Sequence, residues 1–436
     1  MTDRPENSSP SSSSNAAGSN DAGAAKMPNF VAGRGGTRLF SLAALAERIV
    51  DAFHAEHGGK LSVEMIEKPA QRRRLIIETT DYVLAVESVA LSLEQRATLL
   101  EMVYSELFGY GPLDPLFIDP RVTTIAIKGA YQTAVRFGHG ELRSLGPLFN
   151  DEEHLQRIIG RLLADAGIKT ESEWWVLEVG LTIAERPVCV NLVGPPFAVT
   201  LDADLRLHPQ KPPLLPDLVE QGWMTEEASE LIAKIARSPY GCIITGETET
   251  GKTTLLNAMS HLLPAGQTTV SVERAGELRP PSFVQRFIAN TNPLLAGATG
   301  FSGQIAAALA GAPACLLLDE VRGHEPAAIA PLLLNQDAPR QLWAVRGVAD
   351  AKRLQSALGM LARRAAPAHG ESAVHALYER LPFMISVARI QGRLQVFSIA
   401  EWQSRVDSDY PDYALLMRYE DGQARRTDRP LARWLD

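Results

Sequence analysis

The chain has 436 residues, which is enough for two or three domains, and 45% of them are hydrophobic, which is ample for packed cores. Its formal net charge of −8 does not favour a general nucleic-acid surface, so we expect no nucleic-acid partner. The three cysteines stand among apolar neighbours without metal-ligand spacing, which indicates buried thiols in a reducing compartment: Cys189, Cys242 and Cys315.

The N-terminal segment, residues 1–37, is rich in Ser, Asn, Gly and Ala and has almost no large apolar side chains before Phe30. Such a segment cannot bury enough surface to offset its ordering entropy, so we expect a disordered tail. The chain begins without an apolar signal core, and no apolar run approaches the ~20 residues that span a bilayer. We therefore expect a soluble cytoplasmic protein whose membrane association is peripheral, through a partner.

A helical N-terminal region is predicted for residues 38–108. Its first helix begins near Phe40 and places apolar side chains at helical spacing, Leu42, Leu45, Ile49 and Phe53 among them. A second helix is expected from about Ser92 to Phe108, with Ser92 as its N-cap and Gly109 as its stop.

The pattern changes at Gly109, where residues 109–201 predict a smaller α/β domain. Its predicted strands are Val122–Ile127, Thr133–Phe137 and Val188–Val193, and its predicted helix is Asp151–Ala166. Prolines are frequent afterwards, and we take residues 202–216 as an interdomain linker.

The last predicted domain covers residues 217–406. A helix over 225–237 precedes a strand over 241–245, and the apolar runs Thr268–Val272 and Ala314–Leu318 read as further strands. Strands that alternate with helices favour a parallel sheet covered on both faces. Residues 407–436 are charged and proline-flanked, and we take them as a C-terminal tail.

The most informative stretch reads Gly-Glu-Thr-Glu-Thr-Gly-Lys-Thr-Thr over residues 246–254, and it fits the P-loop pattern G-x-x-x-x-G-K-[ST]. A strand precedes it and helical spacing follows, so backbone N–H groups and the helix dipole would face phosphates. We therefore predict ATP and Mg²⁺ as cofactors. The predicted nucleotide-binding residues are Gly246, Thr248, Thr250, Gly251, Lys252, Thr253 and Thr254, with the Thr253 hydroxyl as a Mg²⁺ ligand.

Downstream, the apolar strand Leu316–Leu318 ends in Asp319 and Glu320, as a Walker B motif does. Asp319 is predicted to hold Mg²⁺ and Glu320 to orient the attacking water. Glu273 and Glu277 follow the second strand of this domain. They either polarise water or bind Mg²⁺, or they belong to a capped and solvated loop.

The order of these motifs resembles the ATPases of type II and type IV secretion systems, most of all the tight-adherence (Flp/Tad) pilus assembly branch. The likeness covers roughly residues 98–400 and rests on several separate stretches. They are Glu106–Leu113, Asp119–Ile125, Pro216–Val219, Ile243–Asn257, Asp319–Gly323 and Leu381–Ile399.

This resemblance implies a RecA-like P-loop motor domain with a parallel sheet, preceded by a smaller PAS-like α/β domain. It implies a homo-hexameric ring that uses ATP hydrolysis to move an inner-membrane platform protein, at the inner face of the cell membrane. It also implies catalytic roles for Glu320, Glu273 and Glu277, with Arg322 beside them.

The chain departs from the family at positions that carry chemistry. Glu247 and Glu249 replace P-loop glycines, and each puts a carboxylate near an anionic ligand. Arg274 replaces an aspartate, and Arg346 stands where the family has a phosphate-sensing histidine. The family's N-terminal-domain arginine has no clear counterpart around Leu177–Leu181.

These departures leave three interpretations open. The chain is a diverged but active motor in which Arg346 senses phosphate, or a catalytically degenerate paralogue with a structural or regulatory role, or an unrelated P-loop NTPase. For an active motor we expect slow turnover, because positioned positive charge at the γ-phosphate supplies much of the rate.

Overall fold

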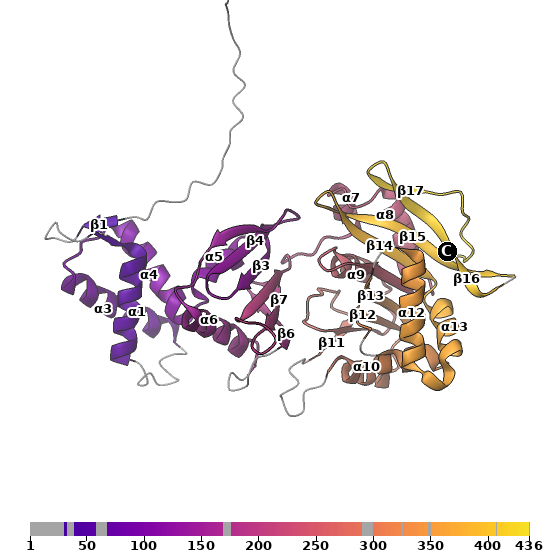
Figure 1. The fold of residues 1–436 in the computed structure, drawn as a ribbon, viewed down its shortest axis with the longest axis horizontal. Helices are drawn as coiled ribbons and strands as arrows, with labels where there is room; N and C mark the ends of the chain where they lie inside the picture. The colour runs from indigo at the N-terminus through magenta and orange to yellow at the C-terminus, as the bar shows by residue number, and fades with distance from the viewer. Residues whose placement is uncertain are drawn as a thin grey trace, which may run out of the picture. The chain divides into compact units, whose positions relative to one another are not determined.

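The structure is a computed structural model that describes residues 30–32, 39–57, 68–168, 176–289, 300–323, 326–347, 350–406 and 408–435. The chain divides into two compact units, Met1–Gly109 and Tyr110–Asp436. Each unit is drawn in Figure 1 and is described below by itself. Of the predicted disordered tail 1–37, only Phe30–Ala32 falls within the described residues, and it forms strand β1.

The first unit is helical, as predicted (Figure 1). Leu45, Ile49 and Phe53 are buried on the first helix, where they pack in one cluster with Leu99 and Val103. The elements are β1 Phe30–Ala32, β2 Leu39–Ser41, α1 Leu42–His57, α3 Pro69–Val86 and α4 Leu93–Phe108.

The predicted N-cap of the last of these helices is confirmed. The Ser92 hydroxyl accepts a hydrogen bond from the Gln95 backbone N–H at 3.2 Å, and the Gln95 side chain accepts from the Ser92 N–H at 3.0 Å. This capping box satisfies two N–H groups that the helix itself leaves without partners.

The second unit begins with a six-stranded antiparallel sheet in the order β5-β4-β3-β8-β7-β6. Helix α6 buries Leu155, Ile158, Ile159 and Leu162 against the sheet, in one cluster with strand residues such as Val190. The elements are η1 Gly111–Leu113, α5 Asp114–Ile118, β3 Val122–Lys128, β4 Gln132–Phe137, β5 Arg143–Gly146, α6 Glu152–Asp165, β6 Val176–Ile183, β7 Arg186–Val193 and β8 Asp202–Leu207.

The predicted linker 202–216 begins too early. Asp202–Leu207 is strand β8, which pairs with both β3 and β7 in the middle of this sheet. The alternation of buried Ala203, Leu205 and Leu207 with more exposed neighbours is a strand pattern that the many prolines nearby obscured.

A nine-stranded sheet follows in the order β11-β10-β12-β13-β9-β14-β15-β16-β17. The six strands from β11 to β14 are parallel, and β13 lies between β9 and β12, so the predicted RecA-like α/β fold is confirmed. The strands are β9 Cys242–Gly246, β10 Thr269–Glu273, β11 Val284–Ile288, β12 Cys315–Val321, β13 Arg340–Arg346, β14 Phe383–Ile390, β15 Arg393–Arg405, β16 Ser408–Glu420 and β17 Gln423–Arg426.

Helices cover both faces of this sheet, as predicted, and two buried clusters mark the two faces. One cluster joins the sheet to α7 Leu215–Glu220, α8 Glu226–Arg237 and α9 Lys252–Ser260. The other joins it to α10 Phe301–Ala310, α11 Pro326–Leu334, α12 Ala351–Ala365 and α13 Gly370–Arg380, with η2 Pro367–His369 between the last two. Ile243 and Ile244 alternate between the two clusters, so the strand before the P-loop is fixed from both sides.

The predicted C-terminal tail, residues 407–436, is wrong for most of its length. Strand β16 pairs antiparallel with β15 and β17 pairs antiparallel with β16, and Figure 1 shows both strands in yellow. They satisfy backbone groups that an edge at β15 would leave unpaired.

The last segment then folds back onto the domain. The fully buried carboxylate of Glu401 accepts hydrogen bonds from the backbone N–H groups of Ala432 and Arg433, and from the Arg433 guanidinium at 3.0 Å. Leu435 is buried in the cluster that contains the P-loop helix. This segment is thus part of the core around the nine-stranded sheet.

Arg433→Ala is expected to lower the free energy of unfolding by about 2–3 kcal/mol, because it removes a charged donor from a buried carboxylate. Arg429→Ala is the matched control: its ion pair with Asp412 is 3.7 Å long and solvent-exposed, so a change below about 1 kcal/mol is expected. Urea unfolding followed by circular dichroism measures both. Equal effects of the two substitutions would contradict this account of the C-terminus.

Candidate functional site

The P-loop connects β9 to α9, and its backbone conformation needs glycine at Gly251. This residue has φ +88°, and a Cβ atom there would lie 2.4 Å from the Trp223 ring. The loop therefore packs against that ring and leads directly into α9. The first backbone N–H groups of α9 have no partner within the helix. Those groups and the positive end of the helix dipole form an anion site.

Lys252, the predicted phosphate-binding lysine, is buried at the start of α9. Its Nζ donates a hydrogen bond to the backbone carbonyl of Glu247 at 2.7 Å. Burial lowers the pKa of this ammonium, while the charges of Glu320 and Asp319 oppose the shift. The lysine is therefore held by its own loop, through a bond that a phosphate oxygen can replace.

Thr253 and Asp319, the two predicted Mg²⁺ ligands, lie together. The Thr253 hydroxyl donates to Asp319 Oδ1 at 3.2 Å. Burial raises the pKa of Asp319 well above its ordinary value, and the charges of Glu277, Glu273 and Glu320 add to the shift. A positive ion beside Asp319 would favour the charged carboxylate.

This pair fits Mg²⁺, which usually takes one or two carboxylates and completes its shell with water and phosphate oxygens. Within the described ranges no group of three or more His, Cys, Asp or Glu side chains is placed to hold a metal. At Thr253 and Asp319, water and the phosphate oxygens of a bound nucleotide would supply the remaining Mg²⁺ ligands.

Glu320 adopts φ +55°, a left-handed conformation that is uncommon outside glycine. Two arginines support it: Arg274 Nε donates to its backbone carbonyl at 2.9 Å, and Arg322 Nε donates to its carboxylate at 3.2 Å. The Arg274 guanidinium also lies 4.2 Å from the centre of the Phe301 ring. Arg274, which departs from the family pattern, thus supports the predicted catalytic glutamate.

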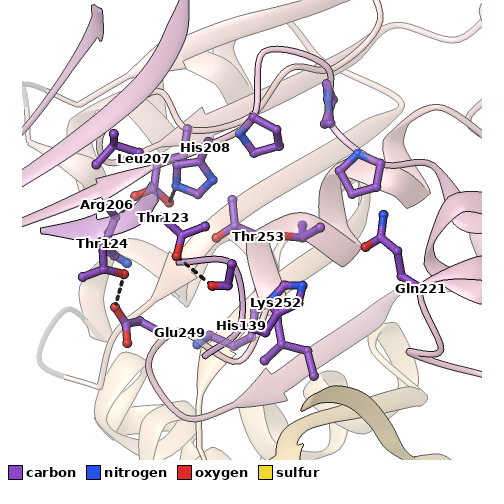
Figure 2. A pocket seen from close by; sticks show the side chains of 18 of the residues that line it. Thr123, Thr124, His139, Arg206, Leu207, His208, Gln221, Glu249, Lys252 and Thr253 are labelled. Atoms are coloured by element: carbon purple, nitrogen blue, oxygen red, sulfur yellow. Dashed lines mark hydrogen bonds and ion pairs between the residues drawn. The ribbon is translucent and has the colours of Figure 1, made fainter. Parts of the chain in front are cut away.

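A cavity of about 540 Å³ adjoins the P-loop within the second unit, and Figure 2 shows part of its lining. Both the six-stranded sheet and the domain of the nine-stranded sheet contribute to it. Seven of the predicted nucleotide-binding or catalytic residues line it: Thr248, Gly251, Lys252, Thr253, Thr254, Glu277 and Glu320. From the six-stranded sheet and its continuation come Thr123, Thr124, Arg136, Arg206 and His208.

Glu249, one of the two acidic residues in the P-loop, is turned toward the six-stranded sheet. Its carboxylate accepts a hydrogen bond from the Thr124 hydroxyl at 3.0 Å, drawn as a dashed line in Figure 2, and it pairs with Arg136. Arg389 Nη2 donates to the backbone carbonyl of Glu249 at 3.1 Å. Burial alone would raise the pKa of Glu249, but the hydrogen bond and charge of Arg136, the hydrogen bond from Thr124 and the charge of Arg206 together lower it.

Glu277 faces the cavity and pairs with basic groups of the six-stranded sheet. Its carboxylate lies 3.6 Å from Arg206 Nη2 and 3.5 Å from His208 Nε2. Burial opposes ionisation, but the charges of Arg206 and His208 hold the pKa of Glu277 far below its ordinary value. Arg206 also lies 3.7 Å from Glu178, which pairs with Arg322 at 2.9 Å. Ion pairs therefore connect Arg206 of the six-stranded sheet, through Glu178, to Arg322, which binds Glu320.

Glu273 does not line the cavity. Its fully buried carboxylate accepts hydrogen bonds from Arg286 Nε and Nη2, each at 2.7 Å, from the Ser271 hydroxyl and from the Leu278 backbone N–H. The alternative of a solvated loop is wrong for both glutamates, because Glu277 is also buried.

The other predicted residues are placed as follows. Gly246 ends β9, and the Thr250 hydroxyl donates to the Glu247 carbonyl at 2.8 Å, which tightens the loop. Glu247 is exposed. Arg346 ends β13 in register with Gly246, and its charge reaches Lys252.

The sequence reading missed the basic residues that the six-stranded sheet brings to the P-loop. Arg136, Arg206 and His208 carry no motif, and the residues they approach lie far along the chain. Even Arg286, which was not given a role, proves to neutralise Glu273. These basic residues meet the P-loop only where the six-stranded sheet packs against the P-loop domain. No local sequence pattern therefore predicts them.

Residues 177–332 match the model of a family described as "Type II/IV secretion system protein", which covers less than half of the chain. A putative conjugal transfer protein of Mycobacterium tuberculosis, found in two strains, is 30% identical over 233 residues. That alignment covers 52% of this chain and 66% of the relative, just under two thirds of its length.

Solved structures show weaker likeness. The VirB11 ATPase of the Brucella suis type IV secretion system is 16% identical, with a TM-score of 0.34 over 66% of this chain and 95% of that one. The ATPase DotB of Legionella pneumophila is 14% identical, with a TM-score of 0.46 over 65% and 78% of the two chains.

Glu277→Gln is expected to lower the free energy of unfolding by about 3–5 kcal/mol at pH 7, because it leaves Arg206 buried without its strongest partner. A carboxyl whose folded-state pKa is depressed stabilises the fold above the unfolded-state pKa, and that stabilisation is lost as the pH falls. The difference between the two proteins should therefore be constant above pH 4.5, the ordinary value for Glu, and shrink below it.

Thermal melting from pH 4 to pH 8 measures this difference. Glu227→Gln is the control, since its ion pair with Arg426 is 3.7 Å long and exposed. A gap that widened toward acid pH would contradict the depressed pKa of Glu277.

Proposed function

We propose that this chain is a nucleotide-dependent motor subunit of the type II/IV secretion ATPase superfamily. The match of residues 177–332 to the type II/IV secretion family supports this place. One observation carries the proposal: buried Lys252, the Thr253–Asp319 pair and Glu320 meet at the carboxyl edge of one parallel sheet. Ligands of open α/β sheets bind at that edge.

The chemistry follows from where each side chain lies. The N–H groups at the start of α9 and the Lys252 ammonium would hold the phosphates of ATP, and Thr253 with Asp319 would hold Mg²⁺. Mg²⁺ bound there would neutralise charge that develops on the phosphates. Glu320 is positioned to orient a water, since Arg274 and Arg322 fix its backbone and carboxylate.

Positive charge for the transferred phosphoryl group has a source in this chain despite the absence of the family's histidine. Arg206 and His208 line the cavity, and Arg346 ends the strand beside the P-loop. Cationic groups at this position stabilise the charge of the transition state. We take Arg346 as the group that meets the γ-phosphate, because it ends β13 in register with Gly246, the first residue of the P-loop.

The finer assignment is to pilus assembly of the tight-adherence type, with a homo-hexameric ring that acts on an inner-membrane platform protein. It rests on the stretches of sequence quoted above, and the similar M. tuberculosis protein is named as a conjugal transfer protein. Among the residues that the structure describes, no helix has the length and apolar character needed to cross a bilayer. We propose a cytoplasmic subunit, peripheral to the inner face of the membrane.

The alternative is a nucleotide-binding subunit that has lost hydrolysis and acts in a structural or regulatory way. The observation that favours it is the burial of Asp319 among acidic groups, since burial and then the charges of Glu277, Glu273 and Glu320 raise its pKa. An uncharged Asp319 would be a poor Mg²⁺ ligand. Turnover separates the two functions.

Lys252→Ala is expected to weaken binding of Mg²⁺–ATP at least about tenfold, because it removes the buried ammonium from the phosphate site. Titration of a fluorescent ATP analogue against both proteins measures the change. Lys211→Ala, which removes a lysine from the rim of the same cavity, is the control and should change the affinity less than about threefold. Equal affinities for the wild type and Lys252→Ala would refute nucleotide binding through the P-loop.

Glu320→Gln should leave ATP binding nearly unchanged and lower phosphate release at least about 100-fold, because it removes the group that orients water. Steady-state phosphate release by the assembled protein measures turnover. We expect slow turnover in the wild type, clearly above that of Glu320→Gln. Identical rates would favour the degenerate subunit, and wild-type rates of several per second would refute the expectation of slow hydrolysis.

A further inference from the structure

The P-loop carries an acidic side chain at a position where the loop must approach phosphate groups. Glu249 lies two residues before Gly251, in a left-handed backbone conformation with φ +60°. A carboxylate costs less in such a loop if its charge is neutralised and its direction is fixed. The structure supplies both, and both come from the six-stranded sheet.

Strands β3 and β4 provide the partners. The Thr124 hydroxyl from β3 and the Arg136 guanidinium from β4 each bind one oxygen of the Glu249 carboxylate. The side chains of Arg136 and Glu249 are only 14% and 22% exposed, so solvent screens the pair little. Arg389 holds the backbone of the same residue from β14.

From this geometry we propose that Thr124 and Arg136 are positioning residues of the phosphate site, which act through Glu249. They form a clamp that turns the carboxylate toward the six-stranded sheet and cancels its charge, so that the P-loop accepts phosphates. The inference rests on the proposed nucleotide binding. It also makes nucleotide affinity depend on the contact between the sheet and the P-loop.

Direct binding of phosphate by Arg136 is the competing explanation, since Arg136 lines the cavity and, among the residues that the structure describes, its buried Nε has no hydrogen-bond partner. The two accounts differ in what Glu249 does once Arg136 is removed. In the clamp, the harm comes from an uncancelled carboxylate beside the phosphates, so removal of that carboxylate repairs it. In direct binding, the lost phosphate contact stays lost.

The experiment is a double-mutant cycle on the full chain, with Mg²⁺–ATP affinity as the readout. Arg136→Gln should weaken binding at least about tenfold. Glu249→Gln alone should bind ATP at least as tightly as the wild type. The double variant should return to within about threefold of Glu249→Gln. Asp204 also lies near Arg136, but Glu249→Gln does not change its charge, so rescue reports on the pair itself.

Glu247→Gln is the matched control, because it removes the same charge from an exposed position of the same loop. It should restore the Arg136→Gln variant by less than about twofold. Thr124→Val is a milder second test should Arg136→Gln lower stability in thermal melting. It should weaken binding about threefold, and Glu249→Gln should again repair the loss.

A double variant as weak as Arg136→Gln would overturn the clamp, and so would full affinity in Arg136→Gln or equal rescue by Glu247→Gln. These failures leave the difference between wild type and Lys252→Ala intact. A wild type that binds no nucleotide would instead defeat the proposed function, and the clamp with it.

Discussion

The rest of this site depends on one constraint: buried carboxylates must be neutralised by neighbouring groups, because water reaches them poorly. The parallel strands end at one edge, and their carboxyl ends collect acidic groups there: Glu273, Asp319 and Glu320. Each buried carboxylate needs a cation or a hydrogen-bond donor, because an isolated charge is costly in such surroundings. The arginines around the edge meet that need. Asp319 instead accepts a hydrogen bond from the Thr253 hydroxyl, and burial raises its pKa well above the ordinary value.

The pairs differ in how fixed they are. Arg286 binds Glu273 with two parallel hydrogen bonds at 2.7 Å and leaves its carboxylate no open direction. The Glu320 carboxylate accepts a hydrogen bond from Arg322 at 3.2 Å, and Glu320 lines the cavity. A group that is oriented yet still open is what a water-positioning residue requires. The hydrogen bonds thus assign a structural role to Glu273 and a chemical role to Glu320. Burial alone does not separate these two roles.

Local patterns in the sequence predicted what local physics determines. The apolar strand before Gly246, the glycine turn and the helix after Lys252 follow from periodicity and from the backbone needs of the loop. Ser92 as a helix cap follows from the same kind of reasoning. Strand β8 and the hairpin of β16 and β17 were missed, because prolines and charged residues in those stretches masked an alternation that pairing with neighbouring strands makes decisive. The sequence marked Glu249 as a source of repulsion, because Arg136, which pairs with it, lies 113 positions away along the chain.

The central claim is that the P-loop binds nucleotide with its own acidic residue turned away and neutralised. A crystal structure of the full chain with Mg²⁺ and a non-hydrolysable ATP analogue tests it most directly. The account predicts phosphate oxygens at Lys252 Nζ in place of the Glu247 carbonyl, and Glu249 still paired with Arg136. A nucleotide bound with Arg136 on its phosphates and Glu249 unpaired would contradict the account, as would phosphates placed away from Lys252.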